Sequence, residues 1–243
     1  IGEHWGGYLP FTFDISQALR SGDNEIVVMV MDPTETAMHQ KGKQRLQPGG
    51  IWYTSTSGIW QTVWLEVVPK RHIVSLKITP SIDTETLELI VRVSDEALEA
   101  GCHIEAGASL EGVKVAEVEG LPNTSLIFEI PNPSLWHPDS PTLYDLEVKL
   151  IHGNEMVDRV DSYFAMRKFS KVKDKKGYWR FALNDEIIFQ YGPLDQGYFP
   201  EGLLTPPSEE AMLFDIEYAK NIGCNMIRKH VKVEPARWYY ACD

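Results

Sequence analysis

The chain has 243 residues, of which 43% are hydrophobic and 24% are charged, and its formal net charge is -12. A chain of this length can bury roughly one to three hydrophobic cores. The acidic balance argues against a nucleic-acid partner, because phosphate binding needs a basic field. No apolar run approaches the ~20 residues of a membrane-spanning helix, so no membrane partner is expected either.

Three cysteines lie far apart, at positions 102, 224 and 242. Their odd number and the absence of a CxxC spacing favour buried or free thiols over a disulfide framework or a metal site, so we expect no metal and no cofactor. No signal peptide is visible, but the chain begins at Ile1 without a Met, which leaves a removed leader open. We expect a soluble protein. A periplasmic or secreted location would suit it, although no residue assigns one.

Residues 1–69 are rich in aromatic and turn residues. A Gly-Gly turn is followed by alternation through Leu9, Phe11 and Phe13. The apolar run 26–31 predicts a buried strand, and the alternating run 58–69 predicts another. The polar stretch 32–50 between them predicts a long loop, which in a compact domain is usually functional or disordered. About three strands are too few for an independent β domain, so part of this unit is expected to lie outside the chain.

Residues 70–167 differ in character and predict one antiparallel sandwich with almost no helix. Short strand-like runs recur between turns that carry Pro, Asn, Gly and Asp. These runs lie at 72–79, 86–94, 101–110, 114–119, 125–130, 143–152 and 155–166.

Residues 168–243 predict a parallel α/β arrangement. A charged linker and a hairpin lead to a strand at 186–191, and a second strand follows at 224–228. Between them, apolar residues at helical spacing predict a helix over 208–222, with Glu209 and Glu210 in its first turn and Gly223 as its stop. A further helix is predicted from Pro235, a residue suited to the first helical position.

Several motifs, in this order, resemble glycoside hydrolase family 2, the β-galactosidase, β-glucuronidase and β-mannosidase group. GGYLPFTFDIS, NEIVVMVMDP and SGIWQTVWLE are similar to its jelly-roll sugar-binding domain. LWHPDSPTLYDLEV and FAMRKF resemble the end of its immunoglobulin-like domain, and IGCNMIRKH resembles the entry to the second strand of its catalytic barrel. The resemblance implies a mainly β chain with three parts: the C-terminal part of a jelly roll (1–69), an immunoglobulin-like β-sandwich (70–167), and the first βα units of a (β/α)8 barrel (168–243).

The resemblance also implies that the parent enzyme cleaves β-glycosidic bonds with retention, a β-galactosidase-like activity being the best match. Retaining chemistry needs two carboxyl groups about 5–5.5 Å apart. In the family these are two glutamates on later barrel strands, and no position here matches either of them. We therefore expect them downstream of Asp243 and expect this chain alone to be inactive.

Three residues are the candidate substrate-binding residues. By the resemblance, Arg228 and His230 end a barrel strand on the catalytic face, where they would bind sugar hydroxyls or orient the catalytic carboxylates. Strand alternation puts these two on one face and turns Lys229 away, which predicts a structural or solvated lysine. Asp195, in the loop after the first barrel strand, could bind a pair of sugar hydroxyls. The alternatives are a structural ion pair for Arg228, a packed ring for His230 and a turn-capping carboxylate for Asp195.

Aromatic residues of the first segment could stack on pyranose rings or belong to the core. They are Trp5, Tyr8, Trp52, Tyr53 and Trp60. The expected partner is a carbohydrate substrate, and a homo-oligomer is left open. Two other functions are considered: a non-catalytic carbohydrate-binding or adhesion module, and a family member that has lost catalysis and serves as a scaffold. The strand–helix–strand end at 186–243 argues against the adhesion module.

Overall fold

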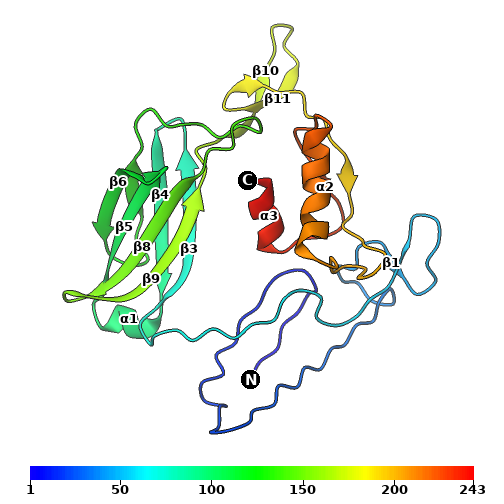
Figure 1. Cartoon of the computed structure of the whole chain (residues 1–243), viewed down its shortest axis with the longest axis horizontal. Helices are drawn as coiled ribbons and strands as arrows, with labels where there is room; N and C mark the ends of the chain where they lie inside the picture. The colour runs from blue at the N-terminus through cyan, green and yellow to red at the C-terminus, as the bar shows by residue number, and fades with distance from the viewer. The chain divides into compact units, whose positions relative to one another are not determined.

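Strands dominate the computed structural model, which describes residues 1–243 (Figure 1). Contacts divide the chain into two units, each described by itself below. The first joins Ile1–Trp64 to Gln190–Cys242, and the second comprises Leu65–Phe189 with Asp243. The predicted boundaries of three family-type domains stay a prediction.

The second unit is built on two antiparallel sheets, drawn in cyan and green in Figure 1. The three-stranded sheet has the order β3-β4-β7, with β3 at Ile73–Ser81, β4 at Thr86–Val93 and β7 at Leu126–Glu129. The four-stranded sheet has the order β6-β5-β8-β9, with β5 at His103–Leu110, β6 at Val113–Gly120, β8 at Tyr144–His152 and β9 at Glu155–Phe164. The predicted sandwich is therefore confirmed.

One hydrophobic core fills the space between these sheets. In β4, every second residue from Leu87 to Val93 is buried, and in β7 Leu126 and Phe128 point inward while Ile127 is half exposed. The period of two follows from strand geometry and gives each sheet one apolar face. Burying one large side chain in this way contributes about 1.5–3 kcal/mol before the cost of ordering is counted. The remaining fully buried side chains of the core include Ile104, Ile130, Leu146, Val148, Leu150 and Met166.

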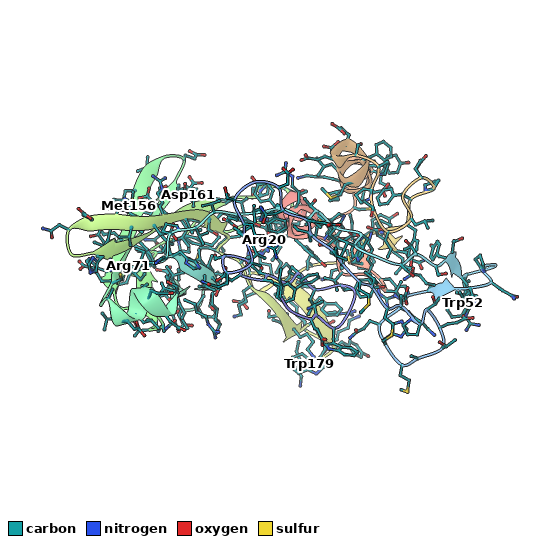
Figure 2. The ribbon with its side chains drawn as sticks, turned by 90° about the horizontal axis from the view of Figure 1, so that it is seen from below. Arg20, Trp52, Arg71, Met156, Asp161 and Trp179 are labelled. Atoms are coloured by element: carbon teal, nitrogen blue, oxygen red, sulfur yellow. The ribbon has the colours of Figure 1, made fainter.

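Two smaller elements complete this unit. The single helix within the sandwich, α1 (Asp95–Glu99), has five residues, in line with the expectation of almost no helix. A three-stranded antiparallel sheet follows, made of β10 (Phe169–Lys173), β11 (Trp179–Leu183) and β12 (Glu186–Ile187). Trp179, labelled in Figure 2, is exposed, and Lys173 Nζ lies 5.2 Å from its ring.

The first unit combines short strands with two helices. Strand β1 (Gln44–Arg45) pairs in parallel with β2 (Tyr53–Thr54), and β13 (Leu194–Asp195) pairs in parallel with β14 (Arg228–Lys229). Helix α2 (Glu209–Asn221) lies between β13 and β14 in the sequence, and α3 (Ala236–Cys242) follows β14. Arg237 Nε of α3 donates to Glu209 Oε1 of α2 at 2.8 Å, which links the two helices.

The sequence predictions for residues 1–69 need correction. Neither 26–31 nor 58–69 is a strand, and their apolar side chains are exposed except for Trp60, with Met29 at 93% and Val63 at 73%. These runs have no partner strand to bond their backbone groups, and an unpaired strand is not stable in water. The stretch 32–50 also differs from a plain loop, because it contains β1 with Gln44 buried. The jelly roll therefore stays a prediction.

The predicted strand at 186–191 is also corrected. Only Glu186–Ile187 is a strand, and it pairs antiparallel with β11. The parallel pairing begins later, at Leu194, and is preceded by one backbone bond in which Asn225 N donates to Tyr191 O at 3.0 Å. The second predicted strand, at 224–228, likewise shifts to Arg228–Lys229. Parallel pairing starts only after the chain has left the hairpin sheet. The barrel itself stays a prediction.

Candidate functional site

The parallel pair β13–β14 positions the candidate site. Helix α2 leads from one strand to the other and is capped by Ser208, whose Oγ accepts from Ala211 N at 3.2 Å. The strands are joined by backbone bonds in which Arg228 N donates to Pro193 O at 2.9 Å and His230 N donates to Asp195 O at 2.8 Å. The side chains at the carboxyl ends of both strands therefore start from neighbouring positions, the edge where parallel α/β folds place ligand-binding residues.

Asp195 and Lys229 share one face of this pair. They are register partners, and Lys229 Nζ donates to Asp195 Oδ2 at 2.5 Å. Asp215 of α2 lies near them: burial raises the pKa of its carboxyl, and the negative charge of Asp195 raises that pKa further. The ring of Trp238 in α3 lies 4.4 Å from Lys229 Nζ. The two helices therefore cover the face that carries Asp195 and Lys229.

Arg228 and His230 are placed on the opposite face. Successive strand residues point to opposite sides, so the residues flanking Lys229 turn away from the helices. Arg228 is exposed and His230 is half-buried. Val231, directly after them, has a φ of +59°, which costs a β-branched residue on the order of 1–3 kcal/mol. Strained backbone of this kind is concentrated at functional positions, where the surrounding structure holds it.

The three predicted substrate-binding residues therefore do not form one cluster. Asp195 uses one carboxylate oxygen to accept from Gly197 N at 2.7 Å, which is the turn-capping use, and the other to accept from Lys229. Its side chain is 16% exposed. A sugar-binding role for Asp195 stays a prediction, as do the roles of Arg228 and His230. Asp195 lies on one face of the strand pair, and strand alternation puts Arg228 and His230 on the other.

Two further charged residues, missed in the sequence, lie behind the strand ends. Lys232 is fully buried, and its Nζ donates to Gly197 O at 2.6 Å and to Leu204 O at 2.7 Å. It also lies 3.1 Å from Glu234 Oε1, and Glu234 accepts from Lys229 at 2.8 Å. Burial lowers the pKa of the Lys232 ammonium, and the charge of Glu234 acts in the opposite direction. No local sequence signal marks Lys232 as buried, because the residues that enclose it, Gly197 and Leu204, are distant along the chain.

Aromatic residues from the N-terminal segment pack against the loop after β13. Tyr53 stacks on Tyr198 with ring centroids 3.8 Å apart, and Thr205 Oγ1 donates to Trp60 O at 2.7 Å. Lys232 Nζ lies 5.0 Å from the Trp60 ring. Tyr8 packs edge-on to Trp60 at 6.2 Å. These rings therefore serve packing in this structure, which was one of the two interpretations open to them.

The other two aromatic candidates lie outside this cluster. Trp52, labelled in Figure 2, is covered by the guanidinium of Arg45 at 4.0 Å from the ring centroid. Trp5 is 82% exposed. A cation over an aromatic face takes the position that a sugar ring would need for stacking, so Trp52 would have to release Arg45 first.

No three His, Cys, Asp or Glu side chains gather to hold a metal ion. All three cysteines are free thiols in this structure, and Cys102 is buried. None of the three helices has the length and apolar character that a bilayer-spanning helix requires.

The fold of this chain is found in solved structures. The chain matches the apo structure of Bacteroides uniformis β-glucuronidase 3 with a TM-score of 0.64 and 21% identity, over 76% of this chain and 23% of that one. Residues 71–167, the sandwich, match the family model described as glycosyl hydrolases family 2. Together with the relatives described next, this match confirms the resemblance to glycoside hydrolase family 2 seen in the sequence.

Curated relatives match along the whole chain. A putative β-glucuronidase of Formosa agariphila is 31% identical over 100% of this chain and 29% of its own length. A β-galactosidase of Thermoanaerobacter pseudethanolicus is 28% identical over 100% of this chain and 33% of its own length. The chain therefore spans about a third or less of the length of these relatives.

Proposed function

We propose that the longer protein to which this chain belongs is a retaining glycoside hydrolase acting on β-glycosides, with a β-galactoside as the first substrate to test. The observation that carries the proposal is that the exposed Arg228 and the half-buried His230 lie at the carboxyl end of β14. Strand alternation assigns both to the face away from Lys229. Matches to enzymes named β-galactosidase and β-glucuronidase support the same class of substrate.

In this proposal residues 190–242 begin a parallel barrel whose open edge receives the sugar. A guanidinium presents a fixed fork of donors, which suits a pair of sugar hydroxyls or a carboxylate of the catalytic pair. The imidazole of His230 offers one donor and one acceptor to a neighbouring hydroxyl. The two carboxyl groups that retention requires are assigned to residues outside this chain.

The contribution of Arg228 can be estimated. Hydrogen bonds from a charged donor are worth about 1.5–3 kcal/mol each, and about 1.4 kcal/mol is a factor of ten in kcat/KM. Loss of the Arg228 fork therefore corresponds to a ten- to hundredfold fall in kcat/KM.

The test uses the full-length protein and the 243-residue chain side by side. Both are assayed with the 4-nitrophenyl β-D-galactoside, β-D-glucuronide and β-D-mannoside. The proposal expects turnover by the full-length protein on at least one substrate with retention of the anomeric configuration, and none by the chain alone. Turnover by the purified chain, or inversion by the full-length protein, would overturn it.

A further inference from the structure

The ammonium of Lys232 has every hydrogen-bonding position filled. Its side chain is 0% exposed, and its Nζ reaches Gly197 O, Leu204 O and Glu234 Oε1 at 2.6, 2.7 and 3.1 Å. An ammonium has three protons to donate, and three acceptors surround it here. A buried charge persists only where it is paired and bonded in this way.

Lys232 is the inner end of a row of four alternating charges. Glu234 Oε1 lies between the two lysines, 3.1 Å from Lys232 Nζ and 2.8 Å from Lys229 Nζ. Lys229 reaches Asp195 Oδ2 at 2.5 Å. Exposed fractions rise along the row, from 0% at Lys232 and 4% at Glu234 to 11% at Lys229 and 16% at Asp195. We call these four residues the charge chain.

Stability alone does not account for the charge chain. Replacing buried ion pairs with apolar residues of similar volume is often neutral or stabilising, because desolvation offsets the attraction between the charges. What buried charges can supply instead is a single defined arrangement of the segments that carry them. The segments joined here are the end of β13, the loop 196–204 and residues 229–234.

The backbone is shaped to fit the charge chain. Gly197 has a φ of +63°, and a Cβ there would lie 2.3 Å from Glu234 Oε1. On the other side, the carbonyl of Val231 lies 2.9 Å from where a Cβ of Gly42 would be. His230 and the strained Val231 lie in the chain between Lys229 and Lys232, whose ammonium groups are bonded to Asp195 and to Gly197 O.

We propose that the charge chain is a positioning device that fixes Arg228 and His230 in the geometry needed to bind a carbohydrate. Lys229 directly follows Arg228, and the His230 amide is bonded to Asp195 O at 2.8 Å, so displacement of either end moves the pair. Asp195 is then a positioning residue and not a sugar ligand. The inference rests on the proposed function, in which Arg228 and His230 face the substrate.

The test compares variants of the full-length protein with its best 4-nitrophenyl β-glycoside. Lys232→Met removes the buried cation and keeps much of its volume. Lys220→Met, on the exposed last turn of α2, is the matched control. The double variant Lys232→Met/Glu234→Gln also removes the negative charge that Lys232 balances in the wild type. We expect Lys232→Met to lower kcat/KM at least tenfold and to speed hydrogen exchange of the His230 amide at least tenfold, with Lys220→Met unchanged.

The double variant separates positioning from stability. If the charge chain positions Arg228 and His230, the double variant should regain most of the melting temperature lost in Lys232→Met. Its kcat/KM should stay at least tenfold below the wild-type value. Recovery of kcat/KM together with the melting temperature would overturn the inference, as would wild-type kcat/KM in folded Lys232→Met. Arg228→Ala, measured in parallel, separates the two claims. Absence of turnover by the wild-type full-length protein removes the proposed function. Wild-type kcat/KM in Arg228→Ala removes Arg228 from the substrate site and the inference with it, whereas a large effect there beside a wild-type-like Lys232→Met removes only the charge chain.

Discussion

The side chains of Asp195 and Lys229 meet at 2.5 Å because the two residues are direct register partners in the parallel pair β13–β14. Arg228, one residue earlier, pairs in register with Leu194 and so lies on the other face. The same strand end thus has a closed half toward the helices and an open half. Substitutions on the closed half should act through position and stability, and those on the open half through binding.

Gly197→Ala should be strongly destabilising. The new Cβ would meet Glu234 Oε1 at 2.3 Å and Lys232 Cδ at 2.9 Å, and the φ of +63° strains any residue with a side chain. Strain of this kind costs about 1–3 kcal/mol, and displacing a buried ion pair adds to it. The free energy of unfolding from urea titration measures the loss.

Gly223→Ala is the control for Gly197→Ala. Gly223 also has a positive φ, +88°, but an added Cβ would meet nothing within 4 Å. It therefore carries the backbone strain without the clash. We expect Gly197→Ala to lose clearly more stability than Gly223→Ala. Equal losses would show that the charge chain can be displaced without a measurable change in the free energy of unfolding.

Tyr198→Phe should leave stability unchanged or raise it at neutral pH and should make it less sensitive to alkali. Burial raises the pKa of the Tyr198 phenol, and the nearby Tyr8 and Tyr53 raise it further. The phenol oxygen is buried without a hydrogen-bond partner, so removing it leaves no acceptor or donor unpaired. Tyr218→Phe, at an exposed position on α2, is the control.

The sign of the alkaline effect follows from linkage. The folded-state pKa of Tyr198 lies above its ordinary value of 10.0, so its contribution to stability is complete below pH 10 and is lost as the pH rises further. The loss is at most about 1.4 kcal/mol per pH unit for one group. Thermal melts between pH 9 and pH 11 should therefore show a shallower decline for Tyr198→Phe than for wild type, while Tyr218→Phe follows wild type.

Phe128→Ala should destabilise the sandwich much more than its neighbour Ile127→Ala. Phe128 is 1% exposed in the core between the sheets, whereas Ile127 is 50% exposed on the outer face of the same strand. Truncating a core Phe costs about 3–5 kcal/mol, and surface changes usually stay within about 0.5 kcal/mol. Denaturant unfolding, monitored by hydrogen exchange of residues 73–164, measures the loss of stability in each variant. Similar losses in the two variants would contradict the assigned strand register.

Local patterns predicted the elements that local physics determines. The acidic first turn at Glu209 and Glu210 and the stop at Gly223 are short-range signals, and α2 (Glu209–Asn221) lies where they predicted a helix. The sandwich strands were equally readable, because a period of two and a turn every few residues need no distant partner to be recognised.

Patterns failed where a distant partner decides the outcome. The apolar run 26–31 reads as a buried strand, but Met29 is 93% exposed because no strand pairs with it. Lys229 was expected to be structural or solvated, and its ion pairs support the first alternative. Nothing near Lys232 in the sequence marks it as buried, because its enclosure comes from Trp60, Gly197 and Leu204, which are distant along the chain.

The most direct test of the account is to measure kcat/KM and the melting temperature of Arg228→Ala on the same preparation of the full-length protein. If Arg228 binds substrate on the open half, Arg228→Ala should lower kcat/KM ten- to hundredfold and keep a melting temperature close to wild type. Arg228→Lys should restore little, because a lysine lacks the fork of donors. A clear loss of melting temperature with wild-type kcat/KM in the folded protein would instead assign Arg228 to a structural ion pair and contradict the account.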